Sequence, residues 1–354
     1  MPRNGPECLH TTGHAAYKTT RRLPMTAPIN YTRRTLALAV ACTAFLGTAT
    51  THAQTSWPAK PINLVVPYAA GGLTDQLARE VGTYMSNELK QPVVVDNRPG
   101  GAAQIGMNVL KAAPADGYTV FFGDVPSLAT NLGLFKKLSY DPRKDLQAVT
   151  QLVVAPALVV VPENSPFRSF EELVTAAKAK PDAISYTSQG VGTGGHLFGT
   201  LMANHIGTTM THAAYRGSLP GLSDLMGGQI NFMYDAIPTS GSFVYSHKLR
   251  ALAIGSDHRA ATLPNVPTLK ELGYGSIVPT FWWGVAVKAG TPKPVVDKLH
   301  QIITAAMHDP VISKKFTDQG VQIKTSNPDE FGRYIHDEIA YWTPIMRAAN
   351  MSAD

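Results

Sequence analysis

Two glycine-rich turns carry the clearest chemical signal in this sequence. The first lies in VVPYAAGGLTD, Val65 to Asp75, where an apolar strand breaks at Ala70-Gly71-Gly72 and a helical pattern follows. The second, Ile184 to Leu197, reads ISYTSQGVGTGGHL and repeats this design. A strand, a glycine turn and a helix start together present unpaired N–H groups and the positive end of a helix dipole, which suit a carboxylate or a phosphate. Two such turns facing each other would form a receptor for a small anion.

The elements that must position these turns alternate along the chain. Strands are expected at 62–67, 93–96, 119–123, 152–161, 184–187, 210–214, 230–234, 250–254 and 283–287. Helices are expected at 74–89, 104–112, 169–179, 195–205, 219–226, 292–307 and 328–346, with Thr74 and Asn327 as caps of the first and the last. This alternation predicts an α/β fold with parallel sheets, in which ligands bind beyond the carboxyl ends of strands. Both glycine turns occupy that position, so the sequence predicts a cleft between them.

The first fifty or so residues have the features of an export signal. Arg33-Arg34 precedes an apolar run from Leu36 to Leu46, and Thr51-His52-Ala53 is a small-x-small pattern that predicts cleavage after this triplet. The run is too short to span a bilayer stably. Sec export and the twin-arginine route both remain open. Cys42 raises a lipoprotein anchor as an alternative, but Ala39 stands where such a site normally has leucine. Residues 1–53 are therefore expected to be an N-terminal extension with a cleaved signal peptide, and the mature protein is expected in the periplasm.

Removal of this leader changes the composition argument. The whole chain has 31 lysine and arginine and 25 acidic side chains, but residues 1–53 hold six of the basic ones and one acid, which leaves a formal net charge of +1. Nucleic-acid binding thereby loses its main support. Cys8 and Cys42 also leave with the leader, which excludes disulfides, cysteine-ligated zinc and cysteine nucleophiles. The remaining 301 residues suggest two lobes.

A series of ordered motifs from Trp57 to Asn350 resembles one known family. The strings WPAKPINLVVPYAAGGLTDQLAR, VVVDNRPGG, PADGYTVFFG, LSYDPRKDLQAVT, SYTSQGVGTGGHL, THAAYRGSLPGLSDLMGGQINFMYD and LPNVPTLKELGY are similar to those of the Bug proteins. These are the periplasmic substrate-binding receptors of tripartite tricarboxylate transporters. Two positions depart from the family pattern: Ala214 stands where proline is usual, and Ala236-Ile237 stands where asparagine is commoner.

The resemblance implies a two-lobed periplasmic binding protein of type II, each lobe a mainly parallel sheet flanked by helices. Lobe 1 is expected to hold residues 57–155 plus 280–354 and lobe 2 residues 156–279, with hinges near Ala155-Pro156 and Val278–Trp283. Such a protein would act as a monomer, close on a small carboxylate and deliver it to the membrane permease subunits of the transporter. Dicarboxylates, tricarboxylates, aromatic carboxylates and acidic amino acids all remain open as ligands. A receptor that presents its ligand to a membrane sensor kinase remains an alternative.

In that family the ligand carboxylate is held mainly by backbone amides and ordered waters at two loops. These loops match Tyr68–Asp75 and Ser188–His196 here. The resemblance therefore implies ligand contacts at Tyr68, Ala70, Gly71, Gly72, Thr74, Asp75, Ser188, Gln189, Gly192, Thr193 and His196. Ser127 and Asp235 follow or end expected strands and are further candidates for a direct hydrogen bond.

Several of these residues have a plain structural alternative. A carboxylate such as Asp75 in a first helical turn stabilises the helix dipole without touching a ligand. His196 is equally consistent with a structural histidine, and Tyr68 with a ring that closes the core. Arg216 could pair with a carboxylate, although bracing of the surface or of the two lobes is the favoured interpretation. The pair Trp282-Trp283 is interpreted as core.

An enzyme finds little support in the sequence. The run from Gly190 to Gly195 satisfies G-x-G-x-x-G, but a dinucleotide enzyme should show an acidic residue ~20 positions on, and Met210 to Ser223 contains none. There is no G-x-S-x-G, H-E-x-x-H or P-loop string, and the histidines lack metal-ligand spacing. We therefore expect no catalytic residue, no metal and no cofactor, and keep a dinucleotide-dependent α/β enzyme only as an alternative.

Overall fold

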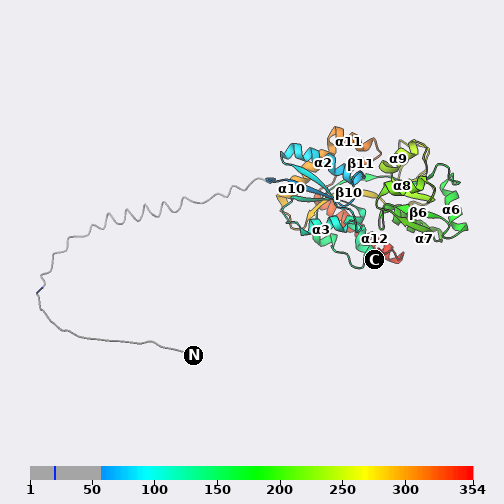
Figure 1. Cartoon of the computed structure of the whole chain (residues 1–354), viewed down its shortest axis with the longest axis horizontal. Helices are drawn as coiled ribbons and strands as arrows, with labels where there is room; N and C mark the ends of the chain where they lie inside the picture. The colour runs from blue at the N-terminus through cyan, green and yellow to red at the C-terminus, as the bar shows by residue number, and fades with distance from the viewer. Residues whose placement is uncertain (1–19, 21–56, 354) are drawn as a thin grey trace, which may run out of the picture. The chain divides into compact units, whose positions relative to one another are not determined.

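The computed structural model describes residue 20 and residues 57–353. The export signal expected in residues 1–53, with its cleavage triplet and both cysteines, lies outside the described residues. From residue 57 on, the chain belongs to one compact unit built on two β-sheets (Figure 1). No helix within this described part is long and apolar enough to cross a membrane.

The first sheet has the strand order β11-β4-β10-β3-β1-β2. Its strands are β1 (Ile62–Val66), β2 (Val93–Asn97), β3 (Thr119–Asp124), β4 (Leu146–Ala155), β10 (Phe281–Lys288) and β11 (Gln322–Ile323). Strand β1 pairs in parallel with β2 and β3, whereas β10 is antiparallel to β3 and β4, and β11 is antiparallel to β4. The runs INLVV and TVFFG are apolar along most of their length, as strands covered on both faces must be.

The second sheet repeats this design with the order β7-β6-β8-β5-β9. Its strands are β5 (Ala157–Pro162), β6 (Ser185–Ser188), β7 (Thr211–Ala214), β8 (Phe232–Ala236) and β9 (Leu249–Gly255). Strand β6 is parallel to β7 and β8, and β5 is antiparallel to β8 and β9. In both sheets a parallel trio is therefore followed by one antiparallel strand, β10 or β5.

The predicted α/β class with two sheets flanked by helices is confirmed, but each sheet is mixed and not mainly parallel. The reason lies in the two crossings between the sheets. Strand β4 runs in the same direction as β3, because both are antiparallel to β10. The chain thus leaves the first sheet at the end where its parallel strands have their carboxyl termini. The next strand, β5, starts from the corresponding end of the second sheet, so it runs antiparallel to the parallel strands there. The same argument applies to β9 and β10.

The single strand expected at 152–161 is in fact two strands that belong to different sheets. They are separated by Pro156, which has no N–H to donate to a ladder. The second crossing runs from the end of β9 to the start of β10. Phe281 in β10 pairs with Ala155 in β4, so the two crossings lie side by side.

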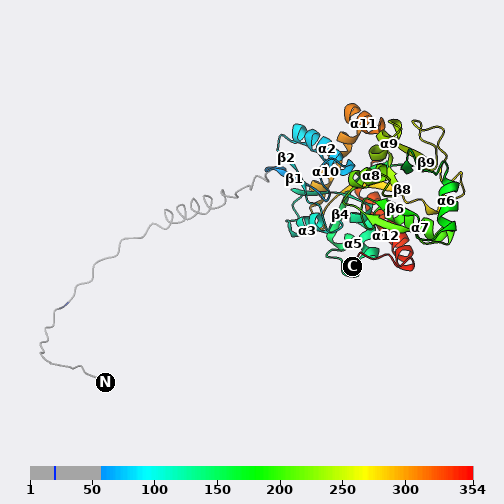
Figure 2. The ribbon, with the colours of Figure 1, turned by 45° about the vertical axis from the view of Figure 1, so that its right-hand side comes forward.

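Helices cover the faces of both sheets, with α2 and α3 beside the first sheet and α6 and α7 beside the second (Figures 1 and 2). Their bounds are α2 Leu73–Leu89, α3 Gln104–Ala112, α4 Asn131–Leu134, α5 Pro142–Asp145, α6 Phe170–Ala179, α7 Gly194–Ile206, α8 Ser218–Met226, α9 Ile237–Tyr245, α10 Lys293–His308, α11 Pro310–Thr317 and α12 Pro328–Ala348, with one-turn elements η1 Pro126–Thr130 and η2 Gly275–Ile277. The sequence missed α9, whose IPTSGSFVY segment has weak helix propensity and is held by burial of Ile237, Ser240 and Gly241.

The cap predicted at Asn327 is confirmed, because its side chain accepts from Glu330 N at 2.9 Å and forms a capping box with Glu330. The cap predicted at Thr74 is wrong. Gly72, in an extended conformation, precedes helix α2, and Thr74 lies inside its first turn. The Thr74 hydroxyl accepts a hydrogen bond from Trp283 Nε1 at 2.9 Å, which joins α2 to strand β10.

Aromatic rings connect the cores of the two sheets. Phe198 stacks on Tyr234 with ring centroids 4.2 Å apart, Tyr234 lies 5.6 Å from Phe281, and Phe281 lies 6.3 Å from Trp283. A separate apolar group, which we call the α7–α12 cluster, consists of Leu134, Leu197, Trp342, Met346 and Met351. It packs α7 of the second sheet against α4 and α12 of the first.

Candidate functional site

A cavity of about 340 Å³ lies where the parallel strands of both sheets end. It is lined by the turns that follow β1, β3, β6, β7 and β8, and by the start of β10. The lining comprises residues 68–74, 76, 124–126, 189, 193, 194, 216–220, 235, 236, 238, 239, 242, 243 and 281–283. Each sheet therefore contributes one side of the cavity, as expected for a fold of this kind.

Four helices begin at this cavity. Leu73, Gly194 and Ser218, the first residues of α2, α7 and α8, belong to its lining, and so do Pro238 and Thr239 in the first turn of α9. The N–H groups in the first turn of a helix have no partner within the helix, and the helix dipole adds a positive partial charge at the same end. In α9 the Ile237 N–H already donates to the Pro156 carbonyl and Pro238 has no N–H, so the open ends are those of α2, α7 and α8. The convergence of these three ends makes the cavity a favourable place for a negatively charged group.

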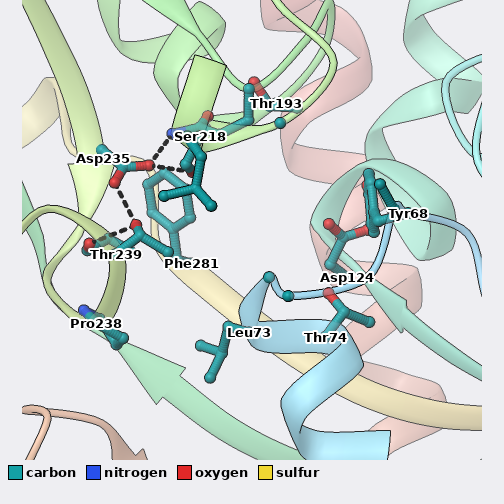
Figure 3. A pocket seen from close by; sticks show the side chains of 18 of the residues that line it. Tyr68, Leu73, Thr74, Asp124, Thr193, Ser218, Asp235, Pro238, Thr239 and Phe281 are labelled. Atoms are coloured by element: carbon teal, nitrogen blue, oxygen red, sulfur yellow. Dashed lines mark hydrogen bonds between the residues drawn. The ribbon is translucent and has the colours of Figure 1, made fainter. Parts of the chain in front are cut away.

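The side of the cavity formed by the second sheet is organised around Asp235, at the end of β8 (Figure 3). Its buried carboxylate accepts from Gln189 Nε2 at 2.5 Å and from Ser218 Oγ at 2.6 Å, and it also accepts from the Thr239 hydroxyl. Burial raises the pKa of Asp235, while these hydrogen bonds act in the opposite direction. We call Gln189, Ser218, Asp235 and Thr239 the second wall.

The opposite side, which we call the first wall, contains Tyr68 and Asp124 (Figure 3). Asp124 ends β3, and its Oδ1 accepts from Ser127 Oγ at 2.8 Å. Tyr68 lies beside the same carboxyl group (Figure 3). Burial raises the pKa of Asp124 to about 6, and burial next to Asp124 raises the pKa of Tyr68 well above its usual range.

Apolar side chains close the remaining sides of the cavity. Phe281 and Trp283 rise from β10, and Leu73 projects from the start of α2. A Cβ atom on Gly194 would lie 2.6 Å from the Phe281 ring, so glycine allows the start of α7 to approach this ring closely. The cavity thus combines helix N-termini and a few polar side chains with an apolar surface, which is typical of small-molecule sites.

Comparison with known proteins identifies the family. Residues 77–351 match the model of the tripartite tricarboxylate transporter family receptor. This chain belongs to that receptor family. The structure of the periplasmic binding protein BugD is 31% identical in sequence with a TM-score of 0.78, over 83% of this chain and 99% of that one. The predicted resemblance to Bug proteins is thus confirmed.

Two related structures contain ligands. The receptor is similar to Rpa4515 of R. palustris with adipate, at 30% identity and a TM-score of 0.78 over 83% of this chain and 98% of that one. It is also similar to MatC of Rhodopseudomonas palustris with bound malate, at 26% identity and a TM-score of 0.77 over 82% of this chain and 99% of that one. Both of these relatives bind a dicarboxylate.

Many residues that the sequence proposed as ligand contacts line the cavity of this receptor. They come from both glycine turns and from the end of β8. They are Tyr68, Ala70, Gly71, Gly72, Thr74, Gln189, Thr193 and Asp235. The structure thus brings the two turns to one cavity from opposite sides.

Asp75 does not line the cavity, because its carboxylate is turned back onto the protein. It accepts from Gly71 N at 2.9 Å and from Asn97 Nδ2 at 3.0 Å, and it forms an ion pair with Arg79 at 2.9 Å. Burial alone would raise the pKa of Asp75, but the hydrogen bonds from Arg79, Gly71 and Asn97 outweigh it and lower the pKa. The structural alternative, an acidic residue that stabilises the start of α2, therefore describes Asp75 better than ligand contact.

His196 and Gly192 also lie outside the lining. The His196 ring stacks on His212 with centroids 4.0 Å apart, and its Nδ1 accepts from Gly192 N at 3.0 Å. Burial lowers the pKa of His196 to about 3 and that of His212 to about 4, so both imidazoles are neutral near pH 7. The Gly192 carbonyl accepts from Thr130 Oγ1 at 3.2 Å. The middle of the second turn thus folds over a histidine pair and away from the cavity.

The two serines proposed from the sequence are engaged in the same way. Ser188 Oγ lies 2.8 Å from His212 Nε2 and donates to the Gly190 carbonyl at 2.9 Å. Ser127 is fully buried and supports Asp124. The residue at the cavity is therefore Asp124, three positions earlier.

Sequence reasoning missed Asp124, Ser218 and Thr239. Asp124 is the last residue of β3, and Asp235 is the second-last residue of β8. This near-equivalence was a usable signal, but β3 was expected to stop one residue too early. Ser218 and Thr239 lie in the first turns of α8 and α9. Their role depends on contact with Asp235 across 17 and 4 residues, which no local pattern indicates.

Asp124→Asn is expected to stabilise the protein at pH 7 by about 1–3 kcal/mol. The pKa of Asp124 rises from 3.8 to about 6 on folding, so the folded state holds this proton more tightly than the unfolded state. The ionised carboxyl therefore destabilises the fold increasingly as pH rises from about 4 to about 6. Urea denaturation at pH 4 to 8 measures this effect. Asp297→Asn, which removes an exposed carboxylate of α10, is the control, and a stability difference for Asp124→Asn that does not change with pH would contradict the assignment.

Proposed function

We propose that this receptor captures a small carboxylate in the cavity between its two sheets and delivers it to the permease subunits of a tripartite tricarboxylate transporter. The observation that carries the proposal is the convergence of the open N-termini of α2, α7 and α8 on one cavity. Arg216 lines the same cavity and forms no ion pair among the described residues. The adipate and malate bound by two relatives are compatible with such a site.

Ligand capture is proposed to involve closure of two lobes. Lobe 1 would hold residues 57–155 plus 280–354 and lobe 2 residues 156–279, so that each contains one sheet. The neighbouring crossings at Pro156 and before Phe281 would serve as the hinge, because a few residues that join two rigid bodies can absorb the rotation. Closure would remove water from the cavity and strengthen the contacts of the amides with the anion.

The proposed role involves no reaction on the ligand. Asp235 accepts from three side-chain donors, and Asp124 accepts from Ser127, so neither is placed as one of a pair of free acid and base groups. No group of three or more histidine, cysteine, aspartate or glutamate side chains within the described residues could hold a metal ion. A receptor of this kind would be exported and would act in the periplasm after cleavage of its signal peptide.

A thermal-unfolding panel tests the binding function. Adipate, malate, citrate and benzoate are compared with NAD and ATP at millimolar concentration. A carboxylate present at about 100 times its dissociation constant should stabilise the protein by about 2.7 kcal/mol. We expect at least one carboxylate to do so and the nucleotides to have no effect beyond that of ionic strength. Stabilisation by nucleotides alone would contradict the proposal and favour an enzyme.

A further inference from the structure

A second recess, which we call the basic groove, lies between the segment that contains α4 and α5 and one face of α12 (Figure 2). Its volume is about 820 Å³, and it shares no residue with the ligand cavity. Its lining comprises residues 111, 132, 135–141, 143–145, 339, 340, 343, 344 and 347. The proposed capture of a carboxylate makes no use of this groove.

The lining of the basic groove is strongly cationic. It contains six lysine or arginine side chains and two aspartates, although the chain after the leader has a formal net charge of only +1. The charged residues are Lys111, Lys136, Lys137, Arg143, Lys144 and Arg347, with Asp141 and Asp145. Positive charge is thus concentrated at one place on a nearly neutral protein, and such a concentration attracts a negatively charged partner.

Both aspartates of the groove are already paired. Asp141 forms an ion pair with Arg143 at 2.8 Å. Asp145 forms one with Lys111 at 3.0 Å. The positive charge that remains must therefore be neutralised by solvent ions or by another molecule.

Two cations of the groove have no counter-charge within the described part of the chain. Lys137 and Arg347 are exposed, and neither forms an ion pair there. They come from the two sides of the groove, Lys137 from the segment after α4 and Arg347 from the last turn of α12. An acidic segment lying along the groove can pair with both.

Apolar side chains lie deeper in the groove than these charges. Ile339 is buried and Leu132, Phe135 and Leu138 are half-buried, whereas all the cations except Lys111 are exposed. A flat membrane surface would meet only the charged rim. A segment of polypeptide can enter the groove and bury its own apolar side chains on the floor.

Helix α12 also leaves a backbone acceptor at the groove. Pro344 lies inside this helix and has no N–H, so the Ala340 carbonyl lacks its usual donor four residues on. Both residues are exposed and line the groove. A bound polypeptide can supply the N–H that the helix does not.

Helices α4 and α12 connect the basic groove to the second sheet. They pack closely, since a Cβ atom on Gly133 would lie 3.0 Å from Thr343 Cα. Leu134 of α4 and Met346 of α12 belong to the α7–α12 cluster together with Leu197 of α7. A partner in the groove would therefore contact the two helices whose packing on α7 changes if the two sheets move relative to each other.

We propose that the basic groove binds an acidic, partly apolar segment of a permease subunit, and that this contact positions the receptor for delivery of its ligand. The inference rests on the proposed function and assigns a surface to the partner. Opposite charges steer such an encounter and fix its orientation, while apolar contacts on the floor stabilise it. Because the partner and the ligand use separate sites, changes in the groove should impair delivery without impairing capture.

A charge-reversal variant tests the assignment. Lys137→Glu combined with Arg347→Glu is compared with the control Lys298→Glu combined with Lys178→Glu. The control makes the same change of charge at exposed lysines of α10 and α6, and Lys178, like Arg347, lies in the last turn of its helix. Each protein is produced in the bacterium of origin after deletion of the receptor gene. The initial rate of uptake is then measured with the radiolabelled carboxylate that stabilises the wild-type receptor most.

We expect the groove variant to lower this rate about tenfold or more, because two attractive contacts become repulsive. Its affinity for the carboxylate, measured by calorimetric titration, should stay within about twofold of wild type because the cavity is a separate site. The control variant should match wild type in both measurements. Lys137→Gln combined with Arg347→Gln removes the charges without reversing them, and an intermediate rate is expected.

A photo-crosslinker at position 135 identifies the partner. Phe135→p-benzoylphenylalanine keeps an aromatic ring in the groove, and irradiation of cells that take up the carboxylate should crosslink the receptor to a permease subunit. Mass spectrometry should place the crosslink in an acidic segment. The same group in place of Lys298 should give no such product. Sedimentation with vesicles of phosphatidylglycerol examines a lipid partner, and we expect equal binding for wild type and the charge-reversal variant.

The possible outcomes separate this inference from the proposed function. Wild-type uptake by the charge-reversal variant overturns the docking assignment while the carboxylate receptor stands. Vesicle binding that the variant loses, without a crosslink to a permease subunit, also overturns it and makes the groove a membrane-binding surface. If the wild-type receptor restores uptake of no carboxylate, the proposed delivery fails and the inference with it. Loss of uptake at unchanged ligand affinity, with a crosslink to a permease subunit, supports both.

Discussion

Replacing Asp235 by alanine is expected to lower the free energy of unfolding by about 3–5 kcal/mol, because three partly buried donors lose their fully buried acceptor at once. Asp235 joins the turn after β6 through Gln189, the start of α8 through Ser218 and the start of α9 through Thr239. Relief from burying a charge offsets part of this loss. Urea denaturation at pH 7 measures the change.

The same substitution is expected to abolish ligand binding, since Gln189, Ser218 and Thr239 all line the cavity. Affinity is measured with whichever carboxylate stabilises the wild-type receptor most. Asp235→Asn is the matched control: its oxygen still accepts one bond and the hydroxyls of Ser218 and Thr239 can rotate to accept from its amide. We therefore expect a loss of stability for asparagine of less than about half that for alanine. Wild-type stability in Asp235→Ala would mean that this carboxyl does not hold the second wall together.

Gly192→Asp is expected to destabilise the receptor by about 3 kcal/mol or more through a steric clash and backbone strain. Gly192 has a φ of +80°, and a Cβ atom there would lie 2.5 Å from Leu134 Cδ2 in the α7–α12 cluster. The new carboxylate would also enter an apolar region. Since Leu134 belongs to the first sheet's side and Gly192 to the second's, the substitution separates the two sides at this contact.

Gly273→Asp is the matched control for this variant. Gly273 is exposed with a φ of +85°, and no atom lies within 4 Å of an added Cβ. Gly273→Asp therefore introduces the strain of a left-handed backbone without the clash, and we expect it to lower the free energy of unfolding by about 1 kcal/mol. Thermal and urea denaturation of both variants measure the difference. Equal losses in the two variants would show that the contact of Gly192 with Leu134 is absent in solution.

The periodic parts of the chain made much of the fold predictable. The spacing of Leu73, Leu77, Val81 and Met85 indicates a helix because these residues recur every four positions and all are buried. The glycine turns indicated the cavity because, in α/β folds of this kind, ligands bind where a parallel strand ends and the next helix begins. The antiparallel direction of β5 and β10 could not be predicted in this way. It depends on the end of one sheet from which the chain crosses to the other sheet.

The candidate site was less predictable because its polar side chains are chosen by distant partners. His196 and Gly192 stand in the sequence as if they faced a ligand, but the stacked ring of His212 draws them away from the cavity. Asp75 stands at a helix start near the cavity, but Arg79 and Asn97 hold its carboxylate. Conversely, Ser218 reaches the site only because β8 brings Asp235 next to α8.

The strand order also determines the sequence in which the two sheets can be completed during synthesis. All strands of the second sheet lie between Ala157 and Gly255, whereas β4 of the first sheet has neighbours that come from Phe281–Lys288 and Gln322–Ile323. The hydrogen bond from Trp283 to Thr74 closes a loop of 209 residues. Contacts of such separation form slowly, because the entropy of closing the loop must be overcome before they contribute. The second sheet can therefore reach its native pairing first, and the first sheet, which begins with β1, is completed last.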